Sequence, residues 1–145
     1  MDTLAFATSP LVLAVMLVWN FAVLSAVQLT VRLIGAYSPT STAFAALLLT
    51  VAGVPVGMAL LGLTQFTFDP TVAAELRARG LALFQAYAFQ QRLTWFPAAI
   101  VLTAGVGFVI IRKTLRFKRT RSAVAAAVGI GLLSAPWVVF LKLPG

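Results

Sequence analysis

The sequence predicts an all-α integral membrane protein with four transmembrane helices and one interfacial amphipathic helix between the second and third spans. Its composition is the first reason. Of the 145 residues, 61% are hydrophobic and only 10% are charged, whereas soluble domains are about 25% charged. Even a soluble domain of about 150 residues buries only about 70% of the surface that its unfolded chain exposes. We therefore expect residues 1–145 to form a single transmembrane helical domain.

The apolar stretches are the second reason, because about 20 apolar residues cross a hydrocarbon core about 30 Å thick. The first stretch covers residues 10–34. It opens with Ser9 and Pro10, a capping residue and a proline suited to the first helical turn. The second stretch covers residues 42–63 and has Pro55 in its middle, where we expect a kink.

Residues 70–93 predict an amphipathic helix rather than a span. Asp69 can cap this helix, Pro70 suits its first turn, and Glu75 precedes Arg79 by four residues in the favourable order. Because the segment is too polar to span, we expect it to lie at the interface or to pack over the bundle. The alternative is that residues 81–111 form one long helix that projects from the membrane. The apolar residues of the 70–93 segment follow helical spacing, namely Leu76, Gly80, Leu83, Phe84 and Tyr87.

Two further apolar stretches predict the third span over residues 95–111 and the fourth over residues 122–141, with Ser122 as the expected N-cap. Between them lies RKTLRFKRTR, residues 112–121, which holds six of the eleven basic residues. Short loops rich in Lys and Arg stay on the cytoplasmic side of a membrane. With four spans, this loop places both termini and the 70–93 helix outside.

The basic residues of this loop are interpreted as contacts to anionic lipid head groups. The formal charge of +8 would suggest nucleic acid as a partner of a soluble protein. Here the basic residues cluster beside apolar spans, so we expect no nucleic acid. The expected partners are the bilayer and other membrane protein subunits. The predicted lipid contacts are Arg112, Lys113, Arg116, Lys118, Arg119 and Arg121.

Small residues recur at four-residue spacing on three predicted spans, a pattern that lets membrane helices approach closely. Gly53 and Gly57 lie on the second span, and the third has Ala99, Thr103 and Gly107. These lines predict either packing within the four-helix unit or a docking surface for another membrane subunit. The fourth span carries the longest line, Ala123, Ala127, Gly131 and Ala135.

One polar track lies inside the predicted bilayer. Asn20, Gln28 and Arg32 share one side of the first span. Polar side chains at this depth need partners. One interpretation is a site for a polar ligand, a lipid head group or a quinone carbonyl. The other is hydrogen bonding between helices by Asn20 and Gln28, with Arg32 reaching the inner surface.

Several function classes are disfavoured by what the sequence lacks. It has no Cys and no His, and its only acids, Asp2, Asp69 and Glu75, fall outside the predicted spans. Haem and most metal sites use His or Cys, and proton- or cation-coupled transporters place a carboxylate or His at membrane depth. The chain also lacks the paired carboxylates and the nucleophile-base pairs that enzymes use.

We therefore predict a non-catalytic protein without cofactors that serves as a scaffold or accessory subunit of a larger membrane complex. The alternative is a membrane transport component or lipid-binding protein that uses the polar track of the first span and the kinked second span. The expected location is the plasma membrane of a bacterium.

From Leu24 onward, the order of features resembles the Yip-type integral membrane family. The resemblance rests on LSAVQLTVRLIGAYSPTSTAFAALLLTVAGVP, on Trp95 opening a later span and on the basic loop before the last apolar stretch. Members commonly have five spans and a Gly-Gly pair at the first loop, whereas here Ala36 follows Gly35 and the family's first span has no counterpart. The resemblance implies a small helical bundle that organises membranes or partner proteins, and no site residue is carried over.

Overall fold

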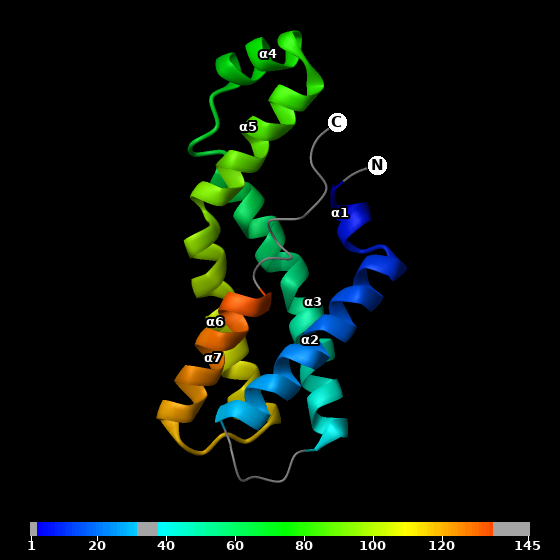
Figure 1. Cartoon of the computed structure of the whole chain (residues 1–145), viewed down its shortest axis with the longest axis vertical. Coiled ribbons are helices and arrows are strands. Elements are labelled where there is room, and N and C mark those ends of the chain that lie inside the picture. The colour runs from blue at the N-terminus through cyan, green and yellow to red at the C-terminus, as the bar shows by residue number, and fades with distance from the viewer. Residues whose placement is uncertain (1–2, 32–37, 135–145) are drawn as a thin grey trace.

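The computed structural model of the chain describes residues 3–31 and 38–134, and these are helical without any strand (Figure 1). The all-α prediction is confirmed for this part of the chain. The helices are α1 (Thr3–Ala7), α2 (Pro10–Val31), α3 (Pro39–Thr64), α4 (Pro70–Arg79), α5 (Leu81–Thr94), α6 (Phe96–Thr114) and α7 (Thr120–Ser134).

Three of these helices are long and apolar enough to cross a membrane, namely α2 over Pro10–Thr30, α3 over Pro39–Thr64 and α6 over Phe96–Thr114. The shorter α7 is apolar and has 15 residues. At 1.5 Å per residue it rises about 22 Å, which is less than the thickness of the hydrocarbon core. Its predicted continuation to residue 141 lies outside the described residues, so the fourth span stays a prediction.

The start of α2 agrees with the sequence, and the starts of α3 and α7 come earlier than predicted. Ser9 Oγ accepts a hydrogen bond from the backbone N–H of Val12 at 3.4 Å, so it caps α2. Ser38 Oγ caps α3 in the same way, and Pro39 occupies the first turn, three residues before the predicted start. Ser122 is not an N-cap, because α7 already begins at Thr120.

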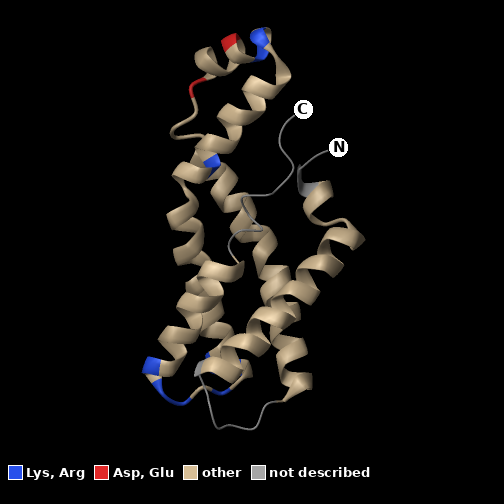
Figure 2. Ribbon diagram, viewed as in Figure 1, with Lys and Arg blue, Asp and Glu red and all other residues tan. Residues whose placement is uncertain are grey.

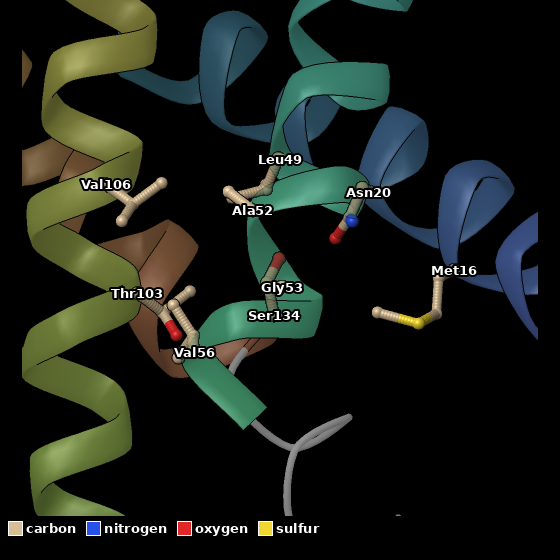
Figure 3. Close-up of a pocket in the computed structure, with 9 residues that line it drawn as sticks. All are labelled: Met16, Asn20, Leu49, Ala52, Gly53, Val56, Thr103, Val106 and Ser134. Carbon is tan, nitrogen blue, oxygen red and sulfur yellow. The ribbon is translucent and has the colours of Figure 1, made fainter. Parts of the chain in front are cut away.

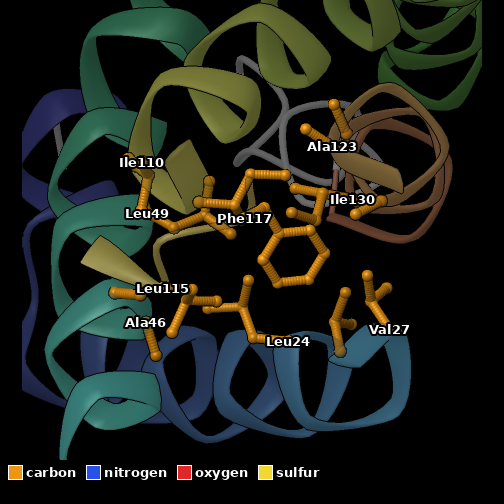
Figure 4. Packing of buried hydrophobic residues seen from close by; sticks show 14 residues of the cluster. Leu24, Val27, Ala46, Leu49, Ile110, Leu115, Phe117, Ala123 and Ile130 are labelled. Atoms are coloured by element: carbon orange, nitrogen blue, oxygen red, sulfur yellow. The ribbon is translucent and has the colours of Figure 1, made fainter. Parts of the chain in front are cut away.

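The four helices α2, α3, α6 and α7 form a closed arrangement in which each contacts two others. Helix α2 packs against α3 and α7, and α6 packs against α3 and α7 (Figure 1). The main apolar core lies between these helices near the α6–α7 loop (Figure 4). Leu115 and Phe117 of that loop are buried in this core, so the basic loop is fixed to the bundle through its two apolar residues.

The prediction of one helix over residues 70–93 is wrong. The segment forms two helices, α4 and α5, because Gly80 interrupts it with φ 156° and ψ 147°. Residues with a Cβ atom rarely adopt such a positive φ, so glycine suits this turn. Gly80 therefore belongs to a helix boundary and not to an apolar helical stripe. The Asp69 cap, Pro70 in the first turn and the Glu75–Arg79 ion pair are as predicted.

The alternative of one long helix over residues 81–111 is also not observed. Helix α5 ends at Thr94 and α6 begins at Phe96, with a break at Trp95. Pro97 explains the break, because proline lacks an N–H and its ring clashes with the carbonyl group four residues earlier. The hairpin of α4 and α5 nevertheless extends beyond the bundle, with α5 leading into α6 (Figure 1).

The charged residues that the structure describes fall into two groups, one at the α6–α7 loop and one on the α4–α5 hairpin with the turn before it (Figure 2). Six basic residues mark the end with the α6–α7 loop. The α4–α5 hairpin and the turn before it carry Asp69, Glu75, Arg77, Arg79 and Arg92. Helices α2 and α3, residues 96–111 of α6 and residues 122–134 of α7 contain no charged residue. This charge-free layer between two charged ends is the distribution expected of a chain that crosses a bilayer.

Candidate functional site

The polar residues of α2 meet threonines of α3. The amide nitrogen of Asn20 donates a hydrogen bond to Thr50 Oγ1 at 3.0 Å, and that of Gln28 donates to Thr42 Oγ1 at 2.6 Å. Each threonine hydroxyl in turn donates a hydrogen bond to a backbone carbonyl oxygen at 2.8 Å, Thr50 to that of Ala46 in α3 and Thr42 to that of Ser38, the N-cap of α3. We call these two contacts the polar pairs.

The polar pairs are inaccessible to solvent. Asn20 is 2% exposed and Gln28 is 4% exposed. The NH₂ group of each amide is used in the contact between α2 and α3, which is the geometry expected of hydrogen bonding between helices. The two residues do not converge on one ligand site, because each has its own threonine. Arg32, the third residue of the predicted track, lies outside the described residues.

Sequence reasoning missed the partners Thr42 and Thr50, although the sequence contains a signal for them. Asn20 and Gln28 are eight residues apart on α2, and Thr42 and Thr50 are eight residues apart on α3. In antiparallel helices joined by a short loop, equal spacing brings both pairs into register. The residues midway between them, Leu24 and Ala46, are both buried in the main core.

A small cavity lies beside Asn20, where α2, α3, α6 and α7 meet (Figure 3). The Oδ1 atom of Asn20 and the hydroxyl oxygen of Ser134 are buried here without a hydrogen-bond partner. Thr103 adds a third polar side chain. The remaining lining residues are apolar: Met16, Leu49, Ala52, Gly53, Val56 and Val106.

The cavity has the size and chemistry of a water site. The cavity has a volume of about 20 Å³. A cavity of roughly 10–15 Å³ is enough to hold one water molecule when polar partners are present. Asn20 Oδ1 accepts a hydrogen bond, and the hydroxyl of Ser134 donates or accepts one. A polar ligand much larger than water does not fit without movement of the helices.

The small residues of α7 are used inside the chain. Ala123, Ala127 and Gly131 are all buried, and Ala135 lies outside the described residues. A Cβ atom on Gly131 would lie 2.7 Å from the carbonyl oxygen of Ile100 and 2.9 Å from Ala104 Cβ. Helix α7 therefore rests directly on the backbone of α6.

Small residues on α6 and α3 serve the same purpose. Ala99, Thr103 and Gly107 of α6 are buried, and a Cβ on Gly107 would lie 2.9 Å from Ile130 Cγ2. On α3, Gly57 is buried, and a Cβ on Gly53 would lie 3.2 Å from Met16 Cε. The described small-residue lines thus pack helices within the chain, which leaves little of them for a partner subunit.

The predicted lipid-contact residues differ in their surroundings. One guanidinium nitrogen of Arg112 donates to the carbonyl oxygens of Phe117 and Lys118, each at 3.2 Å, and the guanidinium lies 5.8 Å from the centre of the Phe108 ring. Arg112 thereby holds the α6–α7 loop. All six predicted lipid-contact residues are exposed, the other five being Lys113, Arg116, Lys118, Arg119 and Arg121.

A few specific contacts hold the α4–α5 hairpin together and fix its base. Trp95 donates from its indole N–H to Thr67 Oγ1 at 3.1 Å, and the backbone N–H of Asp69 donates to the hydroxyl of Tyr87 at 2.9 Å. Arg77 lies 5.4 Å from the centre of the Phe84 ring. Arg92, at the base of the hairpin, is only 4% exposed. Burial lowers the pKa of Arg92 because the charged guanidinium loses solvation.

The described part of the chain contains no group of three or more His, Cys, Asp or Glu side chains placed to hold a metal ion. Comparison of the chain with family models, curated proteins and solved structures finds no match. The resemblance to the Yip-type family therefore stays a prediction.

Proposed function

We propose that this chain is a non-catalytic membrane protein that acts as a scaffold or accessory subunit of a larger membrane complex. The observation that carries this proposal is the α4–α5 hairpin, which extends beyond the bundle (Figure 1). Apart from its own hairpin contacts, it touches the bundle mainly through α5 against α3 and α6. A projecting element of this kind can bind a partner without disturbing the spans.

The hairpin buries little of its apolar surface within the chain. Its buried residues are Ala73, Phe84, Ala88 and Arg92. Phe66, in the turn that leads to the hairpin, is 81% exposed. Apolar side chains at the end of a span gain free energy when a partner or the lipid interface covers them. The exposed large apolar residues of the hairpin are Val72, Leu81, Leu83 and Leu93.

The orientation of the chain in the membrane follows from the basic residues at the α6–α7 loop. We place the α6–α7 loop in the cytoplasm of a bacterium, because Lys and Arg in short loops are retained there. The hairpin then lies on the outer side of the plasma membrane, together with both termini. The partner subunit is therefore expected to contact the hairpin outside the cytoplasm.

Site-specific photo-crosslinking tests the proposal. A photoreactive amino acid at Leu83, on the hairpin, is expected to give an adduct with another membrane protein in native membranes. The same amino acid at Val128, an exposed residue of α7 within the charge-free layer, serves as the control and should label lipid. Migration of the chain as a lone monomer on native gels after mild extraction, without a protein adduct at Leu83, would contradict the proposal.

The alternative function, in transport or lipid binding through α2 and α3, has one observation in its favour. Asn20 Oδ1 faces the cavity and lacks a partner in the chain. This function predicts that Asn20→Leu and Gln28→Leu abolish stabilisation by an added lipid or quinone while the protein still folds. An unchanged response in both variants would exclude it. The scaffold proposal is preferred over a transport path through the bundle because the cavity beside Asn20 has room only for a water-sized group.

A further inference from the structure

A polar groove lies at the basic end of the bundle, separate from the cavity beside Asn20. It is formed where the end of α2, the start of α3 and the end of α6 meet the α6–α7 loop. The groove has a volume of about 490 Å³. This lies within the range of ligand pockets, which is about 300–1,000 Å³. The groove is lined by Gln28, Ser38, Ser41, Lys113, Thr114, Leu115 and Arg116.

The lining suits a negatively charged group. Among the described residues that line it, Lys113 and Arg116 are charged and none is acidic. The hydroxyl groups of Ser38, Ser41 and Thr114 add hydrogen-bond donors. The acids that the structure describes, Asp69 and Glu75, are both at the opposite end of the molecule (Figure 2).

The start of α3 adds to this positive potential. A helix of 26 residues begins at Pro39, and its first turn contains no acidic residue. The N-terminal end of a helix carries a partial positive charge that favours anions nearby. Here that end faces the same groove as the two cationic side chains, so these contributions act on one site.

The groove also lies at the depth of lipid head groups. Lys113 follows Ile111 and Arg112 on α6, where the charge-free stretch of this helix ends. Ser38 precedes the first residue of the apolar α3. In a bilayer, the end of the apolar stretch coincides with the boundary between the hydrocarbon core and the head groups. The phosphate of a lipid in the same leaflet is therefore at the level of the groove.

We propose that this groove binds the phosphate of an anionic phospholipid head group, with Lys113 and Arg116 as the cationic contacts and the hydroxyl groups of Ser38 and Ser41 as additional donors. Lys118, Arg119 and Arg121 do not line the groove. They attract anionic lipid only through diffuse charge, which salt screens. The inference is independent of the partner subunit, because it concerns lipid at the opposite end of the molecule.

The test measures lipid binding to the full-length chain in phosphatidylcholine nanodiscs titrated with phosphatidylglycerol, and compares two double variants. Lys113→Gln with Arg116→Gln should weaken phosphatidylglycerol binding about 30-fold or more, since each substitution removes a charge-assisted hydrogen bond to the phosphate and not only diffuse charge. Lys118→Gln with Arg119→Gln removes the same charge from exposed positions on the same loop. This control should weaken binding by no more than about 3-fold.

A third variant covers the case in which the loss of Arg116 disturbs the loop. Ser41→Asp puts an acid into the groove and also into the first turn of α3, where acids stabilise helices. The variant should fold as well as the unaltered chain and still bind phosphatidylglycerol about 10-fold more weakly. The proposal would be overturned by equal weakening in the two double variants, or by no preference for phosphatidylglycerol over phosphatidylcholine. Displacement of the lipid by millimolar inorganic phosphate would also overturn it, in favour of a soluble phosphate ligand.

Discussion

The contact between α2 and α3 relies on polar side chains, whereas the contact between α6 and α7 relies on the near absence of side chains. In the first, Asn20 and Gln28 bond to Thr50 and Thr42 across the interface. In the second, Gly131 lets α7 rest on the backbone of α6. No side-chain hydrogen bond is found between α6 and α7 within the described residues.

The difference follows from the solvent that we propose for these helices. Lipid tails are as apolar as the side chains, so burial of apolar groups alone gives little attraction between helices in a bilayer. Association must come from hydrogen bonds that lipid cannot replace or from close van der Waals contact. The α2–α3 contact depends on the first, and the α6–α7 contact on the second. The two contacts should therefore respond to different substitutions.

The largest effect is expected at Gly131. Gly131→Val places atoms where the carbonyl oxygen of Ile100 and Ala104 already lie, so the backbones of α6 and α7 must separate. We expect a loss of about 3 kcal/mol of unfolding free energy. The measurement is unfolding by SDS titration from mixed micelles, followed by far-UV circular dichroism.

Gly105→Val is the matched control for Gly131. An added Cβ at Gly105 meets nothing within 4 Å. Both variants introduce the same β-branched side chain into a helix, so the difference between them isolates the contact between α6 and α7. A loss at Gly105 as large as the loss at Gly131 would contradict close packing of these two helices.

A smaller loss is expected at Gly107. A Cβ there would lie 2.9 Å from Ile130 Cγ2, and Ile130 is fully buried. Gly107→Ala should cost about 1–2 kcal/mol. The loss should shrink in an Ile130→Ala background, because the obstructing atoms are then absent. Additive losses in the double variant, measured by the same titration, would mean that the two residues do not touch.

The polar pairs should contribute less than the glycine contacts. Double-mutant cycles for hydrogen bonds between membrane helices average about 0.6 kcal/mol, with a maximum of about 1.7. We expect coupling of this size for Asn20→Val with Thr50→Val, and for Gln28→Val with Thr42→Val. The crossed combination of Asn20 with Thr42 is the control and should be additive. Coupling in the crossed pair would show that the effect is not due to these hydrogen bonds.

The smallest loss of stability is expected when the ion pair of the hairpin is removed. Glu75 and Arg79 form an ion pair on the surface of α4, and both side chains are exposed. Exposed pairs of this spacing contribute about 0.3–0.5 kcal/mol at most, and salt screens them. Glu75→Gln should therefore change the stability by less than the polar pairs do. A loss above about 1 kcal/mol in the SDS titration would indicate that Glu75 has a further role.

Much of the bundle could be predicted because each span is marked by local signals. The apolar length, the capping Ser9 and the Asp69-Pro70 start all depend on neighbouring residues. The start of α3 was predicted too late, since the apolar pattern begins at Thr42 and the cap at Ser38 lies before it. The break at Gly80 was missed for a different reason, because its apolar neighbours follow helical spacing on both sides.

The partners of the polar residues depend on the register of two helices. The sequence showed that Asn20 and Gln28 need partners, and it did not show which residues supply them. Thr42 and Thr50 become recognisable only when the equal spacing on the two helices is compared. Burial of Arg92 was not predicted either, because it depends on how the hairpin sits on the bundle and not on the residues beside it.

The chain has no cysteine, so single cysteines can report directly whether lipid surrounds the charge-free layer. Three variants, Thr71→Cys, Val101→Cys and Thr120→Cys, are each treated with a membrane-impermeant maleimide in intact bacterial cells and again after permeabilisation. Thr71 lies on the hairpin, Thr120 lies beside the basic loop, and Val101 is 71% exposed on α6.

We predict that Thr71→Cys reacts in intact cells, that Thr120→Cys reacts only after permeabilisation, and that Val101→Cys reacts in neither case because lipid covers it. Reaction of Val101→Cys at the rate of Thr71→Cys would show that water surrounds this layer. Reaction of Thr120→Cys in intact cells would show that the basic loop lies outside.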